Sequence, residues 1–154
     1  MRDTTLAREG TFYLEDVYAS EPKLPEGSIK ALRIVQVLPK TTPHANEPTV
    51  GLANASPGKQ VIGTAPVEPD GSAYFRAPAG IPLAFQALDE RGQAVQVMRS
   101  VTYLQPGERA SCVGCHENRM TAPTQLPKPL ALRRAPSAVQ PGPDGSIPLS
   151  YPLL

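Results

Sequence analysis

The chain has 154 residues, of which 19 are Pro and 12 are Gly, so its length suits one domain and its composition argues against a helical bundle. The 15 Lys and Arg nearly balance the 14 Asp and Glu for a formal net charge of +1, which gives no electrostatic support to a nucleic-acid partner. No apolar run approaches the roughly 18–20 residues that a membrane-spanning helix needs, and the first ten residues lack the apolar core of a secretory signal.

The N-terminal third of the chain contains two strand signals and a loop. Residues 1–28 hold one strand-like stretch, Thr11–Tyr18, followed by a turn-rich link. The first core strand is predicted over Ile29–Leu38, because this stretch is short and rich in β-branched residues and a proline stops it. Residues 40–58 show no periodicity, which predicts a long loop of the kind that is often functional or mobile.

Strand signals repeat at short intervals in the middle of the chain. The turn Pro69-Asp70-Gly71-Ser72 and the connection Asp89–Gly92 separate them, because Pro presets φ and Gly accepts positive φ. The last predicted strand places Val95, Val97, Val101 and Tyr103 on one face. Such spacing predicts a mainly β, antiparallel sandwich-like fold. The strands of this region are expected at Val61–Val67, Ala73–Ala77, Leu83–Ala87 and Ala94–Leu104.

The pattern changes after residue 107. Glu108–Met120 has a single β-branched residue and Ser111 can cap a helix that starts at Cys112, so one short helix is predicted. From Thr121 onward Pro is frequent, which predicts an extended linker or a segment draped over a surface. The predicted organisation is an N-terminal strand and linker (1–28), a β-rich domain (29–120) and a Pro-rich linker (121–154).

Both cysteines and one of the two histidines fall in the pentapeptide Cys112-Val113-Gly114-Cys115-His116, which is the c-type haem attachment signature. Two thiols at this spacing can add across the two vinyl groups of a haem, and the adjacent imidazole can bind its iron. On the predicted helix all three side chains would project to one side. The motif therefore predicts a covalently attached haem c, with Cys112 and Cys115 as thioether anchors and His116 as an axial ligand.

Two other chemistries use the same residues. A redox disulfide between Cys112 and Cys115 is typical of a helix N-terminus in a βαβ unit, whereas the strands here read as antiparallel. A zinc site would use both cysteines and His116, with His44 as the remaining imidazole. The alternative prediction is thus a structural or interaction β-domain with a zinc or disulfide site.

The second axial position of the iron has several candidates. His44 lies in the predicted loop, which would have to fold over the haem. Met98 and Met120 offer thioethers, although they also suit strand packing and a helix end. An open position that binds a small molecule is the remaining option. Two arginines can pair with haem propionates and one tyrosine can pack beside the haem or within the sheet; these are Arg99, Arg119 and Tyr103.

Five segments together resemble the middle domain of hydrazine synthase alpha subunits and their relatives, over roughly residues 30–120 of the chain. The resemblance implies a β-rich domain with a covalent c-type haem, and it implies that Cys112 and Cys115 are thioether anchors and His116 the motif histidine. It also implies a larger protein, with a propeller-like region before this domain and a second cytochrome c domain after its Pro-rich linker. The segments are Gly63–Phe75, Phe85–Asp89, Val97–Ser100, Gln105–Glu108 and Ser111–Glu117.

These inferences predict a haem-bearing domain of a larger exported multidomain cytochrome. It would exchange electrons with a partner cytochrome or, as the resemblance implies, take part in haem redox chemistry on small nitrogen compounds, without being a complete enzyme by itself. Haem attachment usually takes place outside the cytoplasm, so the periplasm or an equivalent compartment is expected, with the export signal absent from the chain as given. Neither a nucleic-acid partner nor a transmembrane segment is expected.

Overall fold

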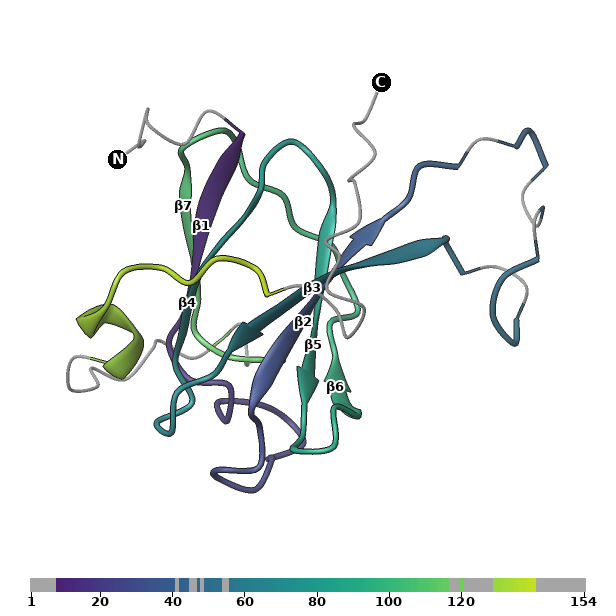
Figure 1. Ribbon diagram of the computed structural model, residues 1–154. Coiled ribbons are helices and arrows are strands. Elements are labelled where there is room, and N and C mark those ends of the chain that lie inside the picture. Colours follow the sequence, from purple (N-terminus) through teal and green to yellow (C-terminus); the bar gives the residue numbers. More distant parts are fainter. Residues whose placement is uncertain are drawn as a thin grey trace.

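Two β-sheets face each other across an apolar core (Figure 1). The computed structural model describes residues 8–40, 42–44, 47, 49–53, 56–116, 120 and 129–140. The three-stranded sheet has the order β4-β1-β7 and the four-stranded sheet the order β3-β2-β5-β6. The elements are β1 (Glu9–Leu14), β2 (Ala31–Val37), β3 (Lys59–Pro66), β4 (Ala73–Pro78), β5 (Leu83–Leu88), β6 (Ala94–Val97), β7 (Arg109–Cys112) and the 3-10 helix η1 (Leu130–Arg133).

Alternation of apolar and polar residues explains how the strands bury one face. In β4 the side chains of Ala73, Phe75 and Ala77 are buried, and the residues between them are half-buried. Phe75 contacts Phe12 of β1 and Phe85 of β5 with ring centroids 5.9 and 5.6 Å apart. Because Phe85 belongs to the other sheet, these aromatic contacts hold the two sheets together. The predicted mainly β, sandwich-like fold is confirmed.

The N-terminal strand occupies the centre of the three-stranded sheet. It pairs antiparallel with β4, from Glu9 opposite Pro78 to Leu14 opposite Ala73. On its other side it pairs in parallel with β7. The strand ends at Leu14 rather than at Tyr18, since the chain turns at Asp16, whose Oδ1 accepts a hydrogen bond from the Tyr18 N–H over 2.8 Å.

The short helix predicted to start at Cys112 is wrong for the residues described there. Arg109–Cys112 forms strand β7, and Ser111 lies opposite Tyr13 of β1 instead of capping a helix. The neighbouring strand supplies partners for the backbone groups of β7, and this outweighs the weak local preference for a helix. His116 then adopts a left-handed backbone with φ of 63°, which a right-handed helix does not allow.

The strand predicted over Ala94–Leu104 is shorter in the structure. Strand β6 ends at Val97, and the chain bends at residues 99 and 100 before Thr102 pairs again with Leu83 of β5. The four residues expected on one face are exposed, with exposed fractions between 41% and 62%, because β6 lies at the edge of its sheet. These four are Val95, Val97, Val101 and Tyr103.

Residues 129–140, which we call the strap, pack on the edges of both sheets. In Figure 1 the strap is the yellow-green segment that contains η1 and then crosses in front of the strands. Ser137 forms a parallel bridge with Phe75 of β4, and Gln140 forms an antiparallel bridge with Thr64 of β3. Since β4 and β3 are the edge strands of their sheets, the strap closes the sandwich on this side. The boundary expected at residue 120 stays a prediction.

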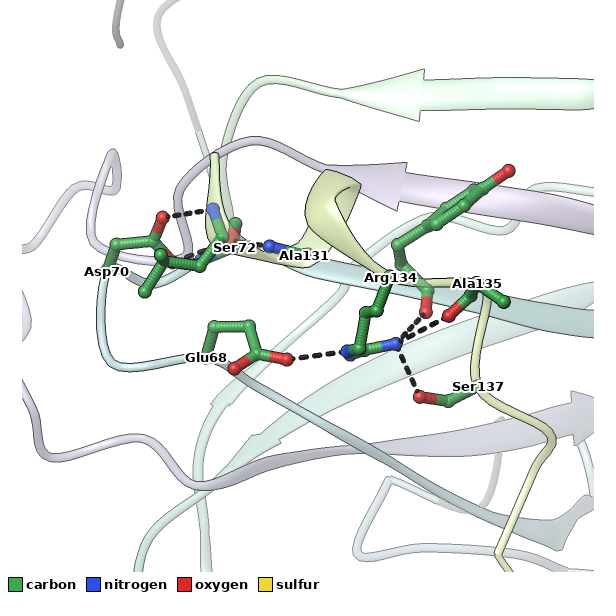
Figure 2. A network of polar contacts seen from close by, with 9 residues as sticks. Glu68, Asp70, Ser72, Ala131, Arg134, Ala135 and Ser137 are labelled. Carbon is green, nitrogen blue, oxygen red and sulfur yellow. Dashed lines mark hydrogen bonds and ion pairs between the residues drawn. The ribbon is translucent and has the colours of Figure 1, made fainter. Parts of the chain in front are cut away.

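Polar contacts attach the strap to the turn between β3 and β4 (Figure 2). Arg134 forms an ion pair with Glu68 at 2.7 Å and donates hydrogen bonds to the Tyr74 carbonyl and the Ser137 hydroxyl. The buried Ser72 hydroxyl accepts a hydrogen bond from the Ala131 N–H over 3.0 Å. The predicted turn residues therefore also bind the strap.

Asp70 completes this attachment. Its Oδ2 accepts a hydrogen bond from the Leu130 N–H over 2.7 Å, and its Oδ1 accepts one from the Ser72 hydroxyl over 2.6 Å. Burial raises the pKa of the Asp70 carboxyl, but the hydrogen bonds from Leu130 and Ser72 lower it by more, so the pKa lies below its ordinary value. The ionised carboxylate thus stabilises the first turn of η1.

Away from the strap, the described parts of the connection between β2 and β3 extend outward from both sheets (Figure 1).

Among the residues that the structure describes, none forms a helix of the length and apolar character that a bilayer-spanning segment requires.

We expect Asp70→Asn to destabilise the protein by about 1 kcal/mol at pH 7, because hydrogen bonds to a charged but solvent-exposed acceptor are lost. The folded-state pKa is lowered, so this stabilisation is present above the unfolded pKa of about 3.9 and disappears as the pH falls through the folded value. Urea unfolding of both proteins between pH 7 and pH 2 measures the difference. Asp89→Asn is the control, since Asp89 caps the turn before β6 and has no contact with the strap; an equal, pH-independent loss in both variants would contradict the assignment.

Candidate functional site

The Cys-Val-Gly-Cys-His segment is fixed by its pairing with the N-terminal strand. Cys112 lies opposite Leu14 at the end of β7. Two further hydrogen bonds prolong the ladder, from the Glu15 N–H to the Cys112 carbonyl (2.9 Å) and from the Asp16 N–H to the Val113 carbonyl (3.0 Å). The backbone of Cys112 and of the residue after it is therefore held by the residues that continue β1.

Gly114 allows the segment to lie against the turn after β1. A Cβ atom placed on Gly114 would overlap the carbonyl oxygen of Ala19. No side chain fits between these two backbones, so glycine is required for the close approach. The turn brings both cysteines to the core, where each is half-buried against the apolar cluster.

Cys112, Cys115 and His116 line a cavity of about 420 Å³ between the two sheets. Its inner walls are apolar, and both sheets contribute to them. The three-stranded sheet supplies Phe12, Leu14 and Phe75, and the four-stranded sheet supplies Leu32 and Phe85. This volume is in the range of small-molecule and cofactor sites.

The outer wall of the cavity is formed by residues 98–102, which we call the arch. Met98, Arg99 and Ser100 line the cavity. The arch is attached to β5 at both ends, by a hydrogen bond from the Met98 N–H to the Phe85 carbonyl (2.9 Å) and by the mutual pair between Thr102 and Leu83 (2.7 and 2.9 Å). The cavity thus lies at the side of the sandwich formed by β6 and β7, opposite the strap.

The His116 imidazole contacts the strand that leads into the arch. Its Nε2 lies 3.0 Å from the carbonyl oxygen of Val97. A carbonyl can only accept, so Nε2 carries the proton in this arrangement. To bind a metal ion through Nε2, the ring would have to leave Val97.

Tyr13 also reaches the cavity wall. Burial raises the pKa of the Tyr13 hydroxyl, and the negative charges of Glu15 and Asp70 raise it further. The phenol is therefore neutral at physiological pH and contributes no charge to the cavity.

Among the candidates for a second axial ligand, the structure brings Met98 to the cavity with Cys112, Cys115 and His116. His44 is exposed in the connection between β2 and β3. Met120 is 91% exposed. Neither lines the cavity.

The remaining sequence candidates are a tyrosine and two arginines. Tyr103 is exposed and is not among the described residues that line the cavity. Arg119 lies outside the described residues. Arg99, by contrast, is part of the cavity wall.

The residues present fit a covalently bound haem. Both cysteines and His116 line the cavity, and most of its other lining residues are apolar or aromatic, as the macrocycle requires. In the part of the chain that the structure describes, no three His, Cys, Asp or Glu side chains are grouped as a metal site would need. The zinc and disulfide alternatives stay predictions.

Comparison with known proteins gives the family. Residues 27–117 match the family described as the hydrazine synthase alpha subunit middle domain. The chain belongs to this family. The matched range begins before β2 and includes the whole Cys-Val-Gly-Cys-His segment, so the resemblance seen in the sequence is confirmed.

Two relatives carry the name hydrazine synthase, both from Kuenenia stuttgartiensis. Hydrazine synthase subunit alpha is 31% identical over an alignment 104 residues long, which covers 58% of this chain and 13% of that subunit. The solved hydrazine synthase structure matches with a TM-score of 0.69 and 25% identity, over 83% of this chain and 20% of the matched chain. The middle domain is thus a small part of these longer relatives.

Sequence reasoning missed most of the cavity wall. Phe12, Leu32 and Phe85 come from three strands that are distant in sequence, and only their pairing brings them together. One available signal was the period-two pattern of Arg109–Cys112, with small or apolar residues at Ala110 and Cys112. It marks a strand and places Cys112 on the inner face.

We expect Gly114→Ala to destabilise the protein by about 1–3 kcal/mol, because the added methyl group forces two backbones apart. Thermal unfolding measures this loss. Gly58→Ala is the matched control, since a Cβ there meets its nearest neighbour at an ordinary 3.6 Å. Equal stability of the two variants would show that the segment does not lie against Ala19.

Proposed function

We propose that this chain binds a haem c covalently, with Cys112 and Cys115 as its thioether anchors and His116 as an iron ligand. The observation that carries this proposal is that Cys112, Cys115 and His116 all line one largely apolar cavity between the sheets. A haem held there would supply one-electron redox chemistry.

Each group of residues has a separate task in this proposal. The cysteines hold the macrocycle at the open side of the sandwich. The rings of Phe12, Phe75 and Phe85, which contact one another over 5.0 to 5.9 Å, exclude water from the inner wall. His116 would hold the iron, for which its ring would have to leave the Val97 carbonyl.

The domain acts within a larger exported protein in this proposal. The chain spans 13% of the curated alpha subunit and 20% of the matched chain, which supports further domains as its partners. A partner cytochrome would exchange electrons with the haem. Covalent attachment supports a location in the periplasm or an equivalent compartment.

The name of the relatives, hydrazine synthase, supports redox chemistry on small nitrogen compounds in the assembled protein. Such chemistry needs an iron position that a small molecule can reach. His44 and Met120 are exposed and are not among the described residues that line the cavity, which leaves Met98 as the sequence candidate to be tested against an open position.

Expression with a haem maturation system tests the attachment. We expect a coloured protein that keeps its haem through acid-acetone extraction, with one iron per chain and no zinc. Cys112→Ser with Cys115→Ser should lose all extraction-resistant colour, because no thioether can form.

Ser111→Ala is the control for this experiment, since Ser111 neighbours Cys112 but is exposed on the outer side of β7. It should keep the haem. A colourless wild-type protein, or one that holds zinc instead of iron, would refute the proposed function.

The openness of the iron is tested with carbon monoxide. We expect the reduced haem protein to bind carbon monoxide rapidly, and Met98→Leu to change the rate less than about threefold, because Met98 would pack against the haem rather than bind the iron. Stopped-flow absorbance measures both rates. A wild-type protein that ignores carbon monoxide while Met98→Leu binds it would instead identify Met98 as the ligand and favour an electron-transfer role.

A further inference from the structure

Among the described residues, one with a permanent charge lines the cavity. Of the residues described as lining it, Arg99 is the one with a permanent charge; the others are apolar, aromatic or neutral polar groups, apart from the titratable Cys112, Cys115 and His116. Arg99 forms no hydrogen bond or ion pair with another described residue. A cation without a partner among the described residues therefore lies on the wall of an apolar cavity.

The backbone holds Arg99 in this position. The residue before it is bound to β5 through the Met98 N–H, and three residues after it Thr102 is bound to β5 by two hydrogen bonds. Val97, the last residue of β6 before the arch, is in contact with His116. Arg99 thus lies on a short bend that is fixed to β5 on both sides, where it is exposed and lines the cavity.

We propose that Arg99 binds the carboxylate groups of the tetrapyrrole at the cavity mouth and so sets which edge of the macrocycle points outward. This inference rests on the proposed function, because it requires a tetrapyrrole in the cavity. The macrocycle of haem is apolar, but its two propionates are ionised at neutral pH.

Burial at the inner end of the cavity would leave the propionates without partners. The inner wall consists of Phe12, Phe75, Phe85 and neighbouring aliphatic side chains, and an unpaired carboxylate in such surroundings is strongly disfavoured. The propionates must therefore face the mouth. There a guanidinium can bind a carboxylate through two parallel hydrogen bonds, which a lysine cannot reproduce.

A binding experiment with iron-free porphyrins tests this assignment without requiring covalent attachment or iron. Protoporphyrin IX has the two carboxylates, and its dimethyl ester has the same macrocycle without the charges. We expect Arg99→Gln to weaken binding of protoporphyrin IX to the chain about three- to tenfold, as for a charged hydrogen bond near solvent, and to leave binding of the ester unchanged. Fluorescence titration of the haem-free protein measures both affinities.

Arg99→Lys and Arg109→Gln complete the set. The lysine variant keeps the charge and should lie between the wild type and Arg99→Gln. Arg109 is exposed on the outer side of β7 and does not line the cavity, so its variant should bind both porphyrins as the wild type does.

Three results would overturn the proposal. The first is that Arg99→Gln and Arg109→Gln change the affinity for protoporphyrin IX equally. The second is that Arg99→Gln weakens binding of protoporphyrin IX and of its dimethyl ester to the same extent. The third is that the wild-type protein binds neither porphyrin. The proposed function fails separately: a protein that shows the Arg99-dependent preference but never retains haem through acid-acetone extraction binds tetrapyrroles without attaching them.

Discussion

The parallel pairing of β7 with β1 is the constraint on which the rest of the site depends. It places Cys112 opposite Leu14. Beyond the paired strands, the N–H groups of Glu15 and Asp16 donate hydrogen bonds to the carbonyls of Cys112 and Val113 and so fix the start of the segment that follows β7. Without it the turn at Gly114 would have no surface to lie against, and the second cysteine and the histidine would have no fixed position. The inner face of β1 carries Phe12 and Leu14, so one strand both positions the reactive segment and forms part of the wall that it faces.

The two sides of the sandwich are built differently. On the side of β3 and β4, the strap bridges both sheet edges, and Arg134 and Asp70 attach it to the turn between these strands. On the side of β6 and β7, the edges stay apart and the cavity lies between them. A sandwich sealed on one side resists shear of its sheets, so the other side can remain open without loss of the fold. This division explains why a Pro-rich segment outside the matched range of residues 27–117 packs so closely on the domain.

Most of the strands could be predicted from the sequence, because their alternation is local. Phe75 between Ala73 and Ala77, and the turn at Asp70–Ser72, are visible in a short window. The element that carries Cys112 was predicted as a helix, since the alternation within the four residues of β7 is a weak signal and the strand depends on its partner β1. The three residues of the haem motif were found by their spacing, whereas the aromatic wall and the contact between Gly114 and Ala19 depend on long-range pairing that no local pattern encodes.

The distance along the chain between β1 and β7 has a consequence for the order of assembly. One strand begins at residue 9 and the other at residue 109, so this contact closes a loop that contains nearly the whole domain, and closure of long loops is opposed by chain entropy. During synthesis from the N-terminus, strands β2, β3, β5 and β6 can pair with one another before the two cysteines have been added to the chain. The wall that carries Cys112 can exist only after all the other strands do, which leaves both thiols on an unfolded and accessible segment until the last pairing is complete.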